Sequence, residues 1–233
     1  MALHPRIAQG ILRLSPALWA LFLACLVPEL VLSLADLAGA GLWRALATGY
    51  LGFWPGLLGD WRPNYPGQAL AMFVTYGVLH AGPVHFAVNM MSLVSLGAAV
   101  EDSVGPRGLL RIYGAALVGG ALGYGALVSG TVPMVGASGA LFGLAGALVF
   151  WGARDGLALG QGLWSRAFWP VWRAVLLLLG LNVVLWVVTG GRLAWQTHLG
   201  GFLAGGAMGL WEIRGEAGDA NGPQSNGPDS KDP

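Results

Sequence analysis

The sequence predicts an all-α membrane protein, a single bundle of six transmembrane helices with a structured first outer loop. Of its 233 residues, 55% are hydrophobic and only 10% are charged, and the mean hydropathy is +0.64. Soluble domains carry about 25% charged residues. Apolar runs of about 20 residues, the length that crosses a bilayer, recur along almost the whole chain.

The expected domain runs over residues 15–212, after a short cytoplasmic segment (1–14) and before a disordered cytoplasmic tail (213–233) rich in Gly, Pro, Asn and Asp. No small-residue cleavage site follows the first apolar run, so we expect an uncleaved helix rather than a signal peptide. The predicted spans, in order, are 15–35, 70–100 with its first part at the interface, 107–129, 136–153, 171–189 and 195–212.

Positive charge predicts the orientation of these spans. With the N-terminus inside, nine Lys or Arg residues fall on inner segments and three on outer segments. This bias places both termini in the cytoplasm. The inner set is Arg6, Arg13, Arg107, Arg111, Arg154, Arg166, Arg173, Arg214 and Lys231, and the outer set is Arg44, Arg62 and Arg192. The short N-terminus favours a bacterial cytoplasmic membrane over an organelle.

Composition also argues against several classes of function. The net charge of +1 gives no basis for nucleic-acid binding. Cys25 is the only cysteine, so it forms no disulfide within the chain and supports no Cys/His metal site. We expect neither a metal nor another cofactor.

The first outer loop, about residues 36–69, is too broken by glycine and proline to span a bilayer. It is nevertheless rich in aromatic rings, which prefer the headgroup level. We expect a structured loop on the outer leaflet, either as an anchor or as a substrate-handling element. Its aromatic residues are Trp43, Tyr50, Phe53, Trp54, Trp61 and Tyr65.

One serine and one histidine stand at the outer ends of two predicted spans. Ser138 lies in the run 136–139 (Gly-Ala-Ser-Gly), and His198 begins the run 198–205. Polar side chains at membrane depth are usually functional. A histidine that takes the hydroxyl proton of a serine makes that serine a nucleophile.

Small residues at a spacing of four suggest how this pair could meet. Gly139 and Gly143 lie in the fourth span, and Gly201 and Gly205 lie in the sixth. Such ridges let two helix backbones approach closely. Generic helix packing is the alternative explanation.

The second span adds His80, His85 and Asn89, the last two on one helix face. Each could instead hold neighbouring helices together, and histidines in a bundle could bind metal or haem. Together with Ser138 and His198, they fit an oxyanion site for peptide-bond cleavage, to which the first amides of the fourth span would contribute. No Asp or Glu is placed to orient His198, so the sequence predicts a dyad.

Four motifs in order resemble the rhomboid intramembrane serine proteases, over about residues 70–212. These motifs are 80-HAGPVHFAVN-89, 97-GAAVE-101, 136-GASG-139 and 198-HLGGFLAG-205. The resemblance implies a six-helix rhomboid-like fold in which the fifth span and the loop after it gate substrate access. It also implies single-span membrane protein substrates, taken from the lipid bilayer and cut near the outer face.

The resemblance implies a role for each matching residue. Ser138 would be the nucleophile and His198 the general base. The supporting positions would be His85 and Asn89 at the oxyanion hole, His80 beside them, Gly136 before the nucleophile, Gly201 and Gly205 in helix packing, and Glu101 as a structural acid.

The chain departs from the family pattern at two places. Phe142 stands where many relatives have a tyrosine stacked on the base, so stacking is retained without the hydroxyl. The Trp-Arg pair found before the second span in many relatives is missing from residues 68–71, and either Trp43-Arg44 or Trp61-Arg62 could replace it.

The sequence therefore favours an intramembrane serine endopeptidase acting through Ser138 and His198. One alternative is a rhomboid-like protein that binds membrane-protein clients without cutting them. A small-solute or metal transporter is a weaker alternative, because the chain shows no convincing internal repeat.

Overall fold

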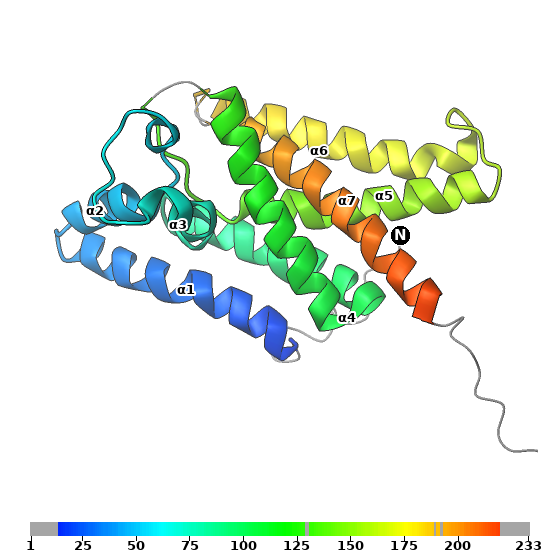
Figure 1. Cartoon of the computed structure of the whole chain (residues 1–233), viewed down its shortest axis with the longest axis horizontal. Coiled ribbons are helices and arrows are strands. Elements are labelled where there is room, and N and C mark those ends of the chain that lie inside the picture. Colours follow the sequence, from blue (N-terminus) through cyan, green and yellow to red (C-terminus); the bar gives the residue numbers. More distant parts are fainter. Residues whose placement is uncertain (1–13, 129–130, 189, 192, 220–233) are drawn as a thin grey trace, which may run out of the picture.

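A computed structural model describes residues 14–128, 131–188, 190–191 and 193–219, with side chains omitted for 188 and 214–219. Almost all of the predicted N-terminal segment and residues 220–233 of the predicted tail lie outside the described residues. The regular secondary structure of the described residues is helical, apart from one isolated bridge (Figure 1). The α-helices are α1 (Pro16–Leu37), α2 (Leu42–Leu51), α3 (Gln68–Thr75), α4 (Pro83–Leu127), α5 (Ser138–Ala158), α6 (Trp169–Val188) and α7 (Trp195–Asp219).

Helix α4 is bent in its middle. Gly105 has φ 68° and ψ 176°, which is not helical, and Pro106 follows it. Proline removes one backbone donor and clashes with the preceding turn, and glycine tolerates the positive φ. The two arms of α4 therefore run in different directions (Figure 1).

Four helical segments are long and apolar enough to cross a membrane: α1, α4, α5 and residues 166–187. The last comprises most of α6 and a preceding short 3-10 helix, η5 (Arg166–Phe168). The prediction of an all-helical chain with several membrane-length helices is confirmed for the described residues. The predicted span 70–100 differs in its first part, where α3 and the 3-10 helix η4 (Tyr76–Val78) precede a long helix that begins only at Pro83.

The centre of the bundle is formed by α4, α5 and α7, which pack on one another more extensively than any other helices. Helix α5 is the most buried of the membrane-length helices. Its residues Gly139, Ala140 and Leu144 are buried among the neighbouring helices. In contrast, α6 contacts mainly α5 and η5, and no described side chain of α6 is buried.

The segment between α1 and α4 is ordered, as the sequence predicted. It contains α2, a 3-10 turn η3 (Pro55–Leu58) and α3, which gather at one end of the bundle (left in Figure 1). Phe53 is fully buried and pairs with Met134 through two backbone hydrogen bonds of 3.0 and 2.9 Å. This bridge fixes the first loop to the segment that leads into α5.

Helix α7 extends to Asp219, beyond the end predicted at residue 212. The sequence after Glu212 is more polar, yet its Arg, Glu and Ala are good helix formers. The apolar part of the sequence therefore ends before the helix does.

Candidate active site

Ser138 is the first residue of α5, and Gly136 lies two positions before it. Gly136 has φ 129°, and its amide donates to the Tyr76 carbonyl at 3.0 Å. A Cβ at Gly136 would lie 2.7 Å from His85 Cε1 and 3.8 Å from Ser138 Oγ. Only glycine fits this backbone conformation and this space.

The side chain of Ser138 reaches His198 on α7. The Oγ–Nε2 distance is 2.9 Å, which is a hydrogen bond between residues sixty positions apart. His198 is 3% exposed. The two candidate residues of the sequence therefore meet inside the bundle.

Close contact of α5 with α7 brings them together. A Cβ at Gly201 would lie 2.0 Å from the Gly139 carbonyl oxygen, and a Cβ at Gly205 would lie 2.4 Å from the Gly143 Cα. The two glycine pairs face each other across the helix interface. No larger residue fits here without separating the helices.

Two further side chains hold the His198 ring. Phe142, one turn into α5, is stacked on it with ring centroids 4.2 Å apart and an interplanar angle of 5°. Asn182 of α6 lies on the opposite ring nitrogen, with its Oδ1 2.6 Å from His198 Nδ1. The sequence predicted that no Asp or Glu orients His198, and it did not identify this amide.

The sequence does carry a signal for Asn182. It is the only polar side chain between Ala174 and Val188, in the middle of an apolar helix. An isolated polar group at membrane depth suggests a partner inside the protein. Its partner could not be identified without knowing which face of α6 meets α7.

His85 lies in the first turn of α4, with its ring close to Gly136. Its Nδ1 accepts a hydrogen bond from the Ala81 amide at 3.3 Å. The ring proton is therefore on Nε2, the atom nearer to Gly136. His85 thus presents an N–H donor beside the start of α5.

Asn89 and His80 are both buried near His85. The Asn89 amide donates to the His85 carbonyl at 2.7 Å, one turn earlier in α4. The His80 ring packs edge-on against His85, with centroids 5.3 Å apart. These contacts place all the polar residues predicted from the second span within one cluster.

Arg44 of α2 ties the first loop to this cluster. Its guanidinium binds Glu29 of α1 at 2.9 and 3.0 Å, Asp36 at 2.8 Å and the His80 carbonyl at 2.8 Å. The hydrogen bonds that Arg44 donates to the Glu29 carboxylate raise the pKa of Arg44. Of the two candidate Trp-Arg pairs, Trp43-Arg44 therefore contacts the site region, whereas Arg62 is exposed.

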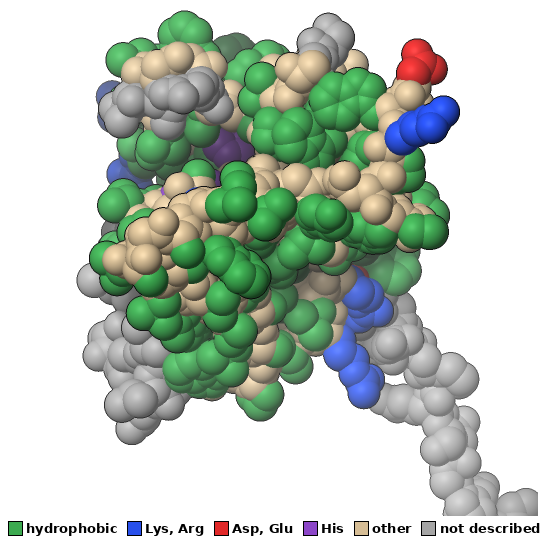
Figure 2. All heavy atoms as spheres, turned by 90° about the vertical axis from the view of Figure 1, so that its left-hand side faces the viewer, with side chains coloured by type: hydrophobic (Ala, Val, Ile, Leu, Met, Phe, Trp, Pro, Cys, Tyr) green, Lys and Arg blue, Asp and Glu red, His purple; other side chains and the backbone are tan. Residues whose placement is uncertain are grey.

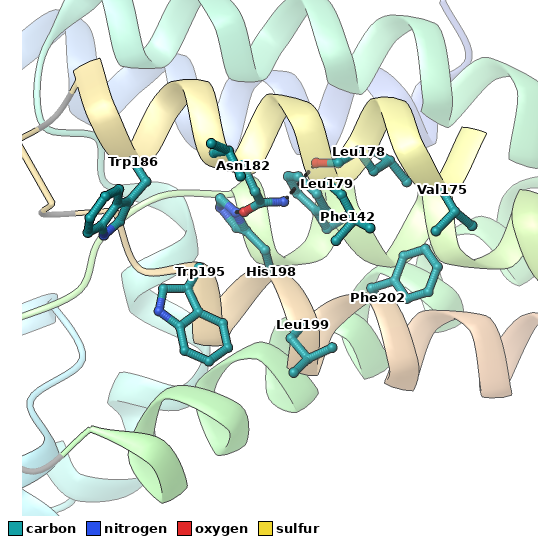
Figure 3. Close-up of a pocket in the computed structure, with 11 residues that line it drawn as sticks. Phe142, Val175, Leu178, Leu179, Asn182, Trp186, Trp195, His198, Leu199 and Phe202 are labelled. Carbon is teal, nitrogen blue, oxygen red and sulfur yellow. Dashed lines mark hydrogen bonds between the residues drawn. The ribbon is translucent and has the colours of Figure 1, made fainter. Parts of the chain in front are cut away.

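An apolar cavity of about 650 Å³ adjoins His198. It lies between α6 and α7, with Phe142 at its floor and Trp186 and Trp195 towards one end (Figure 3). We call it the α6–α7 groove. The end of the molecule that carries α2 and α3 is largely hydrophobic, and histidine atoms are visible in a hollow there (Figure 2).

Comparison with known families decides the class of the protein. The Rhomboid domain family matches residues 67–215, about two thirds of the chain, including every residue of the cluster from His80 to His198. The chain belongs to the rhomboid family. With its apolar helices, this membership makes it an integral membrane protein.

Individual relatives match this rhomboid chain over shorter stretches. It is 44% identical to Rhomboid protease GluP of Bacillus subtilis (strain 168) over 73 residues, which is 31% of this chain and 14% of GluP. It is 30% identical to RHOMBOID-like protein 6, mitochondrial, of Arabidopsis thaliana over 156 residues, 65% of this chain and 46% of that protein. RHOMBOID-like protein 5 of the same plant is 37% identical over 140 residues, 57% of this chain and 40% of that protein. The matches span less than half the length of each of these relatives.

The site of this rhomboid chain has the parts that acyl transfer requires. A hydroxyl touches an imidazole nitrogen, and the first amides of α5 have no partner within the helix. The N-terminus of a helix also carries partial positive charge, which stabilises an anion placed there. A carbonyl seated between Ser138 and His85 would meet both a nucleophile and donors for its oxygen.

Proposed function

We propose that this chain is an intramembrane serine endopeptidase that cleaves membrane-spanning substrates near the outer face. The observation that carries the proposal is the 2.9 Å hydrogen bond between Ser138 Oγ and His198 Nε2, at the start of a buried helix. Family membership supports a protease or a rhomboid-like protein, and this contact favours the protease.

In the first step, Ser138 Oγ attacks the scissile carbonyl carbon and its proton moves to His198 Nε2. The carbonyl oxygen becomes an oxyanion. Backbone amides at the start of α5 and the His85 Nε2–H would donate to it. Losing one such donor typically raises the barrier by roughly 2.7–4 kcal/mol.

Collapse of this intermediate breaks the peptide C–N bond. The proton on His198 Nε2 moves to the leaving nitrogen, and the acyl group stays on Ser138 Oγ as an ester. A water molecule then loses a proton to His198 Nε2 and attacks the ester carbon. The bond between this carbon and Ser138 Oγ breaks, the acid is released, and His198 returns the proton to Ser138 Oγ.

The membrane arrangement that fits this chemistry has six spans. Each 22-residue arm of α4, 83–104 and 106–127, is about 33 Å long and so long enough to cross a bilayer. Helix α7 would be the sixth span. In this arrangement, Lys and Arg are in excess on the segments that would face inward. The positive-inside rule would then put both termini in the cytoplasm of a bacterium.

In this arrangement, Ser138 and His198 lie towards the outer face, at the end of the bundle that carries α2 and α3. Substrates would be single-span membrane proteins reached from the bilayer. A helix must unwind before its peptide bond can enter the site, because helical carbonyls are already hydrogen-bonded.

Cleavage in liposomes tests the proposal. Purified protein is reconstituted with a fluorescently tagged single-span substrate that has helix-breaking residues near its outer end. We expect a product from the wild type and none from Ser138→Ala or His198→Ala, with all three equally folded. Cleavage that persists in Ser138→Ala would exclude Ser138 as the nucleophile.

A further inference from the structure

We propose that Asn182 is the positioning residue of His198, so that the base is competent only while α6 lies against α7. This inference rests on the proposed function and names a regulation of the same site. Asn182 is the one residue of α6 that hydrogen-bonds to either member of the Ser138–His198 pair in the described chain.

A second hydrogen bond indicates which atom donates and which accepts in the contact between Asn182 and His198. The Asn182 side-chain NH2 donates to the Leu178 carbonyl at 3.0 Å, one turn earlier in α6. That bond orients the amide so that Oδ1, an acceptor, faces His198 (Figure 3). His198 Nδ1 must therefore carry the proton, and Nε2 keeps its lone pair for the Ser138 hydroxyl.

The surroundings make this hydrogen bond strong. Apart from Asn182 and His198, the residues that line the α6–α7 groove are aliphatic or aromatic, among them Val175, Leu179 and Phe202. Hydrogen bonds strengthen at low dielectric, and an unpaired buried N–H there is costly. The tautomer with the proton on Nδ1 is thus favoured as long as the Asn182 oxygen is present.

Helix α6 is the least firmly held membrane-length helix. None of its described side chains is buried, and its main neighbours are α5 and η5 rather than α7. Leu177, Val183 and Val187 are each more than 60% exposed within the protein. Its distance from α7 can therefore change without unpacking the glycine interface of α5 with α7.

Movement of α6 away from α7 would remove the acceptor at Nδ1. The ring could then exchange its proton through water and carry it on Nε2. In that tautomer, Nε2 donates and cannot take the proton of Ser138. The catalytic pair would be switched off although both residues stay in place.

A purely structural role for Asn182 is the competing explanation, since amides often join membrane helices. The two roles differ in what a variant changes. Loss of helix packing alone lowers stability, whereas loss of positioning lowers the reactivity of Ser138 in folded protein.

Three variants separate these roles. Asn182→Leu keeps the approximate size and removes the acceptor, Asn182→Asp keeps an acceptor oxygen, and Val183→Ala trims a neighbouring groove residue as control. Each is measured for its labelling rate with a fluorophosphonate serine probe and for its melting temperature. We expect Asn182→Leu to label at least about tenfold more slowly at unchanged melting temperature, Asn182→Asp to recover most of the rate, and Val183→Ala to match the wild type.

The tautomer of His198 is read directly by nitrogen-15 NMR of protein labelled at histidine. The chain has only four histidines, and a His198→Gln sample assigns the signal. We expect a protonated Nδ1 and a bare Nε2 in the wild type, and loss of this pattern in Asn182→Leu. A wild-type ring protonated on Nε2 would overturn the inference whatever the activity.

The dependence on α6 is tested by filling the groove while keeping the amide. Leu199→Trp places a large ring between α7 and α6, and we expect slower labelling and the same tautomer change as in Asn182→Leu. Unchanged labelling and tautomer in Leu199→Trp would refute the link to α6. Equal labelling of Asn182→Leu and active wild type would refute the positioning role, whereas a wild type that is folded and unlabelled would refute the proposed function instead.

Discussion

Proton positions at single residues determine whether the site can act as an acyl-transfer centre. The Ala81 amide bonds to one nitrogen of His85, and Asn182 bonds to one nitrogen of His198. The first contact leaves His85 with a donor and the second leaves His198 with an acceptor. Of the two histidines, His85 can therefore donate a hydrogen bond through Nε2, whereas His198 can accept one through Nε2. The difference comes from the partner that each Nδ1 has.

Replacing Gly136 by alanine should disturb the donor side of the site. The added methyl would lie 2.7 Å from His85 Cε1 and 3.0 Å from its Nε2, so the ring must move. We expect turnover to fall about 10²- to 10³-fold, the usual effect of losing one oxyanion donor. The control is Gly114→Ala, where the methyl meets nothing within 4 Å. Wild-type turnover in Gly136→Ala would show that the His85 ring takes no part.

The sequence predicted most of the residues in this cluster but not Asn182. Ser138, His198, His85 and Phe142 lie in short motifs, where neighbours along the chain mark their environment. Asn182 lies in a uniformly apolar helix without a motif. Its importance comes from the lateral placement of α6 against α7, which no local pattern encodes.

At the scale of helices, the α5–α7 interface sets the distance between serine and histidine. Gly201→Ala should therefore destabilise the protein, because the new Cβ would lie 2.0 Å from a backbone oxygen that has no rotamer to change. We expect overpacking to lower the free energy of unfolding by about 1–3 kcal/mol, and the melting temperature in detergent to fall. Gly180→Ala in α6 meets nothing within 4 Å and should unfold at the wild-type temperature or slightly above it. Equal melting of the two variants would contradict the close helix contact.

The attachment of α2 to α1 is a second element-level feature with a test. Glu29 is 3% exposed, and Arg44 neutralises it. Arg44→Met leaves a buried carboxylate without its cation, which costs about 3–5 kcal/mol. We expect a clear drop in melting temperature, partly restored by adding Glu29→Met, and no drop in Arg62→Met. If Arg62→Met were the more damaging, the first loop would be fixed by the other Trp-Arg pair.

Hydropathy predicted the long helices well, but it did not predict where α4 begins or where α7 ends. The sequence predicted separate spans at 70–100 and 107–129, and in the structure α4 is broken between them at Gly105, which is not helical, and Pro106. The start of α4 was placed too early, because residues 68–78 are as apolar as a span. Their short helices belong to the structured first loop, whose buried bridge from Phe53 to Met134 is a long-range contact.

For the whole molecule, orientation in the membrane is the property that the charge pattern predicts. Cys25 is 1% exposed, so its replacement by alanine gives a cysteine-free background. In intact cells, a membrane-impermeant maleimide should label Asp60→Cys in the first loop and leave Leu159→Cys, after α5, unlabelled until the cells are opened. The reverse pattern would place both termini outside and contradict the positive-inside assignment.

The proposed function depends on Ser138 being an activated nucleophile inside the bundle. The most direct test is labelling of detergent-purified protein with a fluorophosphonate probe, comparing the wild type with Ser138→Ala and His198→Ala. The geometry predicts a covalent adduct on Ser138 in the wild type alone, because the hydroxyl needs the imidazole 2.9 Å away to lose its proton. Equal labelling of His198→Ala, or none in folded wild type, would contradict the account.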